Sequence, residues 1–198
     1  EAVFLFRDQL YYRKNMKIAV NTRLLLEGKM DGIAWFTYET MKRITRQHPE
    51  HEFIFIFDRP FSESFIFSDN VQGVIAHPQS RHPVLWYMFF EFGIPAVLKK
   101  HKPQLFLSPD GWLSLNTRVK SMAVIHDLNF EKHPEFIPWL VRNYYHYFFP
   151  RFARRADRIA TVSEYTKMDI AQRYGVSPEK IDVVYNGANE KYIPVTNE

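Results

Sequence analysis

The sequence predicts an α/β fold with a doubly wound, mostly parallel sheet and helices on both faces. Short apolar runs suited to buried strands alternate with longer stretches of helical periodicity along the chain. Three of the runs end directly in polar or turn-forming pairs, which are His126-Asp127, Ser163-Glu164 and Asn186-Gly187. Ligands of open α/β sheets bind beyond the carboxyl ends of the strands, so we expect these side chains on one common rim. Such a rim has the layout of an active-site cleft.

Seven apolar runs are candidates for the strands. They are short and bounded by turn residues, which favours buried strands over helices. They cover residues 17–21, 53–57, 71–76, 105–107, 123–125, 159–162 and 181–184. Because helical stretches separate most of them, their connections should be crossovers, and the sheet should be mostly parallel.

Helical periodicity lies between these runs. In residues 33–46, the apolar side chains of Ile33, Phe36, Met41 and Ile44 recur near a 3.6-residue period. Further helices are predicted over residues 83–100, with a break or kink at 93–95, over 139–156, and over 164–174, ended by Gly175. Residues 60–70 and 129–138 are predicted to be loops.

Composition indicates one substantial domain of an ordinary globular protein. The chain has 198 residues, 46% of them hydrophobic and 24% charged, with a net charge of +4. The absence of cysteine excludes disulfides and cysteine-based zinc sites. It is also compatible with a protein of the reducing cytoplasm. Met16 leads directly into the first strand, so residues 1–15 are expected to be an extension outside the fold, and residues 16–198 to form the domain.

Glycine spacing excludes two nucleotide-binding motifs. No two glycines stand as G-x-G, and no Walker-type loop is present. What remains is a glycine loop that enters a helix at Gly32, where backbone N–H groups can hold a phosphate. A plain turn is the competing interpretation.

His126, Asp127 and Ser163 are the polar residues that most invite a chemical role. His126 is compatible with acid–base chemistry, with contact to a sugar, or with a loop position that has no chemical role. Its spacing from Asp127, His133 and Asp157 matches no standard zinc site. Ser163 lacks the flanking glycines of a hydrolase nucleophile and is better explained as the cap of the following helix.

Two binding functions were weighed for the second half of the chain. Residues 169–177 resemble the first part of a helix-turn-helix, but the element that follows is predicted to be a strand, so no nucleic-acid partner is expected. Residues 139–158 mix aromatic and arginine side chains. We expect most of these aromatics in the core, with peripheral contact to anionic lipid as the alternative.

Several blocks in this order resemble the N-terminal domain of retaining glycosyltransferases of family 4, which have the GT-B architecture. The likeness runs from about Met16 to the end of the chain. The blocks are DGIAWFTY (31–38), IHDLNF (125–130) with HPE (133–135), PRFARRADR (150–158), TVSE (161–164), and YGVSPEKI (174–181) running into NG (186–187). Asp31 and Ala34 replace two of the three glycines usual in the family's first loop.

The resemblance implies transfer of a sugar from a nucleotide-sugar donor to an acceptor, which would be a sugar or glycan, a lipid-linked molecule or a small molecule. The anomeric configuration would be retained, and no metal or other cofactor would be needed. His126 would then contact the transferred sugar, and the Gly32 loop would face the diphosphate. Ser163, Glu164 and Asn186 would line the rim, and Asp110 and Asp127 would touch the acceptor or brace loops.

The family's donor-binding domain would follow Glu198, so the 198 residues are expected to be half an enzyme and inactive alone. The complete enzyme is expected to be cytoplasmic, and its peripheral contact would be with the inner face of the membrane. A catalytically idle binding or regulatory domain of the same fold is the alternative.

Overall fold

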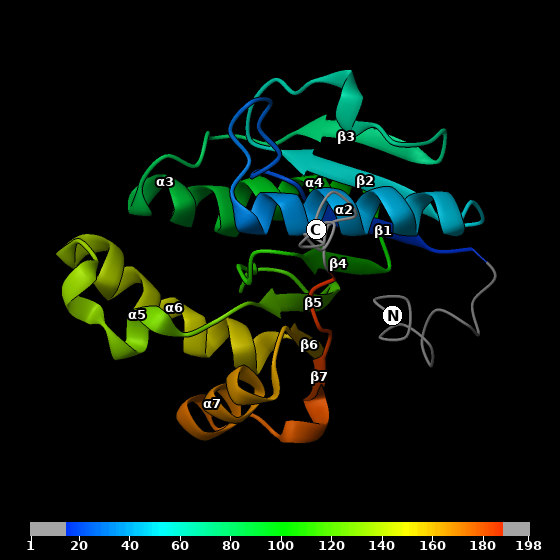
Figure 1. Cartoon of the computed structure of the whole chain (residues 1–198). Coiled ribbons are helices and arrows are strands. Elements are labelled where there is room, and N and C mark those ends of the chain that lie inside the picture. Colours follow the sequence, from blue (N-terminus) through cyan, green and yellow to red (C-terminus); the bar gives the residue numbers. More distant parts are fainter. Residues whose placement is uncertain (1–14, 188–198) are drawn as a thin grey trace, which may run out of the picture.

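The computed structural model describes residues 15–187 of the chain. Of the expected N-terminal extension, only Asn15 falls within this range. Within it, seven strands form one sheet in the order β3-β2-β1-β4-β5-β6-β7, and every neighbouring pair is parallel (Figure 1). The strands are β1 (Lys17–Asn21), β2 (Glu52–Phe57), β3 (Val71–Ile75), β4 (Leu105–Ser108), β5 (Lys120–Ile125), β6 (Arg158–Thr161) and β7 (Ile181–Val183). The predicted strands and the predicted parallel sheet are confirmed.

The helices cover both faces of the sheet, as predicted. Alternate side chains of a strand point to opposite faces, so in β2 Phe53 and Phe55 pack in one core, and Ile54 and Ile56 in the other. The core of Phe53 and Phe55 contains side chains of α2 (Gly32–Gln47). The opposite core is closed by α3 (Pro83–Met88), α4 (Ile94–His101), α6 (Trp139–Arg155) and α7 (Glu164–Tyr174) (Figure 1).

The predicted helix over 83–100 is interrupted by a π-helical turn, η3 (Phe89–Gly93), between α3 and α4. The interruption overlaps the predicted kink at Gly93, but its π-helical form was not expected. A Cβ atom on Gly93 would lie 2.4 Å from the carbonyl oxygen of His77, so only glycine fits there.

Short helices occupy both predicted loops. Residues 60–70 contain η2 (Glu63–Phe65), and residues 129–138 contain α5 (Asn129–Lys132) and η4 (Pro134–Phe136). Each is a single short turn, too brief to show helical periodicity in the sequence. The loop predictions are therefore wrong at these residues.

The caps of α7 follow the predicted chemistry. The Ser163 side chain accepts a hydrogen bond from the Thr166 N–H, and Gly175 ends the helix with a positive φ of 64°. The chain then continues through η5 (Pro178–Lys180) into β7, so a strand follows the turn, as expected.

Among residues 15–187, no helix has the length and apolar character needed to cross a membrane. The long helix α6 buries Tyr144, Phe149 and Phe152, in line with the expectation that most of its aromatics belong to the core. Trp139 and Leu140, in its first turn, remain exposed.

Candidate active site

The predicted rim residues follow neighbouring strands at one edge of the sheet. β5, β6 and β7 are adjacent and parallel, so their carboxyl ends meet at the same edge. His126 comes directly after β5, Ser163 follows β6, and Asn186 follows β7. Their predicted common location is therefore confirmed, whereas contact with a substrate stays a prediction.

The imidazole of His126 is held in one orientation. Its Nε2 lies 2.8 Å from the carbonyl oxygen of Pro109, and its ring meets Phe36 of α2 edge to face at a centroid distance of 4.8 Å. A carbonyl only accepts hydrogen bonds, so Nε2 carries the proton, and in the neutral ring Nδ1 is the acceptor. Half-buried His126 thus keeps an acceptor nitrogen for a ligand hydroxyl.

Asp110 braces the rim from within. Its carboxylate forms a buried ion pair with Arg23 at 2.8 Å and also accepts hydrogen bonds from Asn21, Ser108 and the Trp112 N–H. The Arg23 guanidinium also lies 4.7 Å from the centroid of the Trp112 ring. Both oxygens of Asp110 already have partners, so of its two predicted roles, the structure favours bracing the loop over touching an acceptor.

Gly32 opens α2 and is exposed, with no atom within 4 Å of the position a Cβ would take. A ligand has room to approach the backbone here. Asp31 precedes it as the N-cap, and its side chain accepts the Ala34 N–H at 2.9 Å. A carboxylate therefore already satisfies part of the helix start where the sequence suggested a phosphate.

The remaining predicted site residues differ in how they are engaged. Asp127 is exposed, and its carboxylate accepts the Asn129 N–H at 2.9 Å. Ser163 is occupied as the cap of α7, whereas Glu164 and Asn186 are exposed. Exposed polar groups thus lie along the rim, and Ser163 mainly positions the helix beside them.

An apolar hollow of about 30 Å³ lies behind the rim, between α2 and strands β4 to β6. Phe36 and Pro109, the two residues that hold His126, are part of its lining. A volume of this size suits about one water molecule, so the hollow does not accommodate a sugar ring. A sugar at His126 would lie on the outer side of the rim.

Sequence reasoning missed three residues that shape the rim. Arg23 lies just beyond β1, whereas Pro109 contacts His126 from the turn after β4, and Phe36 contacts it from α2. Arg23 could have been found from the sequence, because it is one of the polar residues that follow β1, just as His126 follows β5. Nothing local in the sequence pointed to Pro109 or Phe36 as partners of the imidazole.

The fold recurs in solved structures of low sequence identity. The lipopolysaccharide outer core galactosyltransferase WaaB in its apo form matches with a TM-score of 0.56 and 15% identity over 87% of this chain and 46% of its own. Anabaena Alr3699/HepE, solved in complex with UDP and glucose, matches with a TM-score of 0.52 and 17% identity over 88% and 45%. The UDP-GlcNAc 2-epimerase from Methanocaldococcus jannaschii also matches, with a TM-score of 0.50 and 15% identity over 86% and 45%.

These structural likenesses establish the fold, half of a GT-B enzyme, and the chain spans less than half the length of each of the three proteins. No curated protein shows a significant match to the chain. The model of the family described as Glycosyltransferase Family 4 matches residues 30–192, which is most of the sequence and includes all of the predicted rim residues. The chain therefore belongs to Glycosyltransferase Family 4, as the N-terminal half of the GT-B fold.

Proposed function

We propose that this domain forms the acceptor side of an enzyme that transfers a sugar from a nucleotide-sugar donor to an acceptor with retention of configuration. The observation that carries the proposal is the rim itself, where an oriented His126 stands among exposed polar groups in a member of this family. The UDP and glucose bound to the HepE structure support a nucleotide sugar as the donor.

In this proposal, His126 accepts a hydrogen bond from a hydroxyl of the transferred sugar through Nδ1. Its Nε2–H is already donated to Pro109, so the ring cannot rotate away from the sugar without losing that bond. The transferring sugar gains positive charge in the transition state, and a preorganised polar group stabilises such charge without reorganising.

The donor diphosphate would approach the start of α2 at Gly32. The first amides of a helix have no acceptor within the helix, and their partial positive charge favours an anion. Asp31 competes for this position, since its carboxylate caps the same turn. We therefore assign the diphosphate a contact with the outermost amides, and the main binding of the nucleotide to a second domain.

The proposal is tested with the enzyme that carries both domains. The enzyme is incubated with UDP-glucose or UDP-galactose and with lipid-linked or oligosaccharide acceptors. The anomeric configuration of the product, measured by NMR, should equal that of the donor. An inverted product would refute retention. A folded two-domain protein that binds UDP but transfers nothing to any acceptor would favour a binding or regulatory domain.

We also propose that the domain touches the inner face of a membrane through the segment that leads into α6. Phe136, Trp139 and Leu140 are 80%, 67% and 50% exposed and close together in sequence, and Arg142 follows them. Aromatic and basic groups together suit the interface of an anionic bilayer. In a sedimentation assay, the chain should pellet with phosphatidylglycerol vesicles, and the W139S/L140S variant should stay in the supernatant. Tyr185→Ser, which changes an exposed aromatic residue elsewhere, should pellet as the wild type does.

A further inference from the structure

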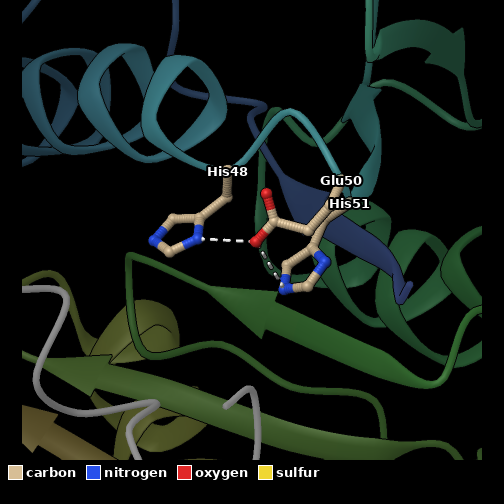
Figure 2. A group of neighbouring side chains, drawn as sticks. All are labelled: His48, Glu50 and His51. Carbon is tan, nitrogen blue, oxygen red and sulfur yellow. Dashed lines mark hydrogen bonds and ion pairs between the residues drawn. The ribbon is translucent and has the colours of Figure 1, made fainter. Parts of the chain in front are cut away.

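Three potential metal ligands lie in the turn between α2 and β2. His48, Glu50 and His51 each offer one ligand atom, and these atoms lie within 4.8 Å of one another (Figure 2). It is the one such group found among residues 15–187. β2 begins directly after this turn, so the group lies at the amino edge of the sheet, away from the rim that carries His126.

The spacing of the ligand atoms is close to that of a tetrahedral site. His48 Nδ1 lies 3.0 Å from Glu50 Oε1, and His51 Nε2 lies 3.9 Å from the same oxygen. Bonds of about 2.0–2.1 Å to Zn²⁺ place tetrahedral ligands about 3.3–3.4 Å apart. The observed distances lie on either side of this value, so small rotations of the Glu50 and His48 side chains would complete the geometry.

His51 is the anchor of the group. Its side chain is only 3% exposed, its Nδ1 has no hydrogen-bond partner, and its Nε2 points at Glu50 from beyond hydrogen-bond range. An imidazole binds a metal through one ring nitrogen, and Nε2 is the nitrogen of His51 that faces Glu50. A cation at Nε2 would give this nitrogen a partner at bonding distance, which Glu50 at 3.9 Å does not.

The carboxylate of Glu50 is suited to the same task. Its Oε1 faces a ring nitrogen of each of the two histidines. A carboxylate oxygen placed between two imidazole nitrogens can complete a set of three ligands around one cation.

The backbone that carries the ligands is held in place. The Asn70 amide nitrogen lies 2.9–3.1 Å from the carbonyl oxygens of Thr45, His48 and His51 and shares its two protons among them. The turn is thus tied to the segment before β3. Ligands on a backbone that is already ordered bind a metal at a smaller entropic cost.

We propose that His48, Glu50 and His51 form a site for a divalent transition metal of the Zn²⁺ class, with water as the fourth ligand. Two imidazoles and one carboxylate are a donor set that suits Zn²⁺. The metal would join the end of α2 to the start of β2, so it would stabilise the domain from the edge opposite the rim.

The test uses the untagged 198-residue chain, stripped with a chelator and titrated with ZnCl₂ by calorimetry. We expect one Zn²⁺ per chain, and a melting temperature that rises by about 5–10 °C when free Zn²⁺ is about a hundredfold above Kd. His48→Gln and Glu50→Gln should each weaken binding by about tenfold or more, and both change side chains that are partly exposed.

His133 provides a matched control. It begins the same His-Pro-Glu sequence as His48, and its Nδ1 lies 3.2 Å from Glu135 Oε1, but Phe136 follows where His51 stands in the other copy. His133→Gln should leave Zn²⁺ binding unchanged. The proposal is overturned if the wild-type chain binds no Zn²⁺ at 100 μM concentration, if His48→Gln binds it as the wild type does, or if His133→Gln weakens binding equally.

Discussion

His126 depends on residues far away in the sequence for its orientation. Its Nε2 donates to the carbonyl oxygen of Pro109, and the next residue, Asp110, is locked in a buried ion pair with Arg23. The polar network behind the rim therefore holds the loop that holds the imidazole. A histidine tied in this way can act as a preorganised ligand, because its tautomer and direction are set before any substrate arrives.

We expect His126→Ala in the two-domain enzyme to lower kcat by about 100-fold while the melting temperature changes little. The side chain is half-buried at a strand end, so its removal leaves no large core cavity. Steady-state kinetics and thermal melts measure the two effects separately. Unchanged turnover would take His126 out of the site, and a collapse of the melting temperature would make its role structural.

At this scale, the sequence revealed the location of residues but not their partners. His126 and Ser163 could be placed because each follows an apolar run, and strand ends share an edge. The bracing role of Asp110 could not be derived, because Arg23 is 87 residues away and nothing local pairs the two. The metal-ligand group at His48 was missed because its spacing follows no standard zinc pattern.

Whole elements were easier to predict than their irregularities. The strands show as apolar runs, and α7 has a serine at its start and a glycine at its end, so local chemistry was enough. The π-helical turn at Phe89–Gly93 was not predictable in form, because one wide turn leaves the apolar pattern of a helix nearly unchanged. Glycine is required at position 93 because a Cβ atom there would meet the carbonyl oxygen of His77, which lies in a distant segment.

Glu91 in this π-helical turn should make stability depend on pH. It is nearly buried and accepts the Leu115 N–H at 2.9 Å, and burial, opposed by its hydrogen bonds, raises its pKa above the ordinary 4.5. A carboxyl whose pKa is raised in the folded state is neutral in both states at low pH, and it costs stability as pH rises from the unfolded pKa to the folded pKa. Relative to Glu91→Gln, the wild-type chain should thus lose stability as pH rises above about 4.5.

Urea unfolding of both proteins from pH 4 to pH 8 measures this difference. The substitution itself can shift stability by a constant amount, so only the change of the difference with pH is informative. Parallel stability curves would show that the Glu91 carboxyl titrates as it does in the unfolded chain.

At the scale of the whole molecule, the two-faced sheet and the family could be predicted from sequence, but the extent of the site could not. The predicted rim residues lie at one edge of the sheet, and the hollow behind them has room for about one water. The chain covers less than half the length of the structures with the same fold. In the proposed enzyme, the described residues would therefore supply one wall of the site, and a second domain would supply the other.

We therefore expect the 198-residue chain alone to show no detectable turnover of UDP-glucose or UDP-galactose, although it folds. One wall does not hold donor and acceptor in a reactive arrangement, and it does not exclude water from the sugar. Positioning alone can lower the barrier of a bimolecular reaction by about 7–11 kcal/mol. Radiolabelled transfer assays with the chain, beside the two-domain enzyme and its His126→Ala variant, measure this, and circular dichroism verifies folding. Turnover by the chain alone at a rate near that of the two-domain enzyme would show that the rim is a complete active site.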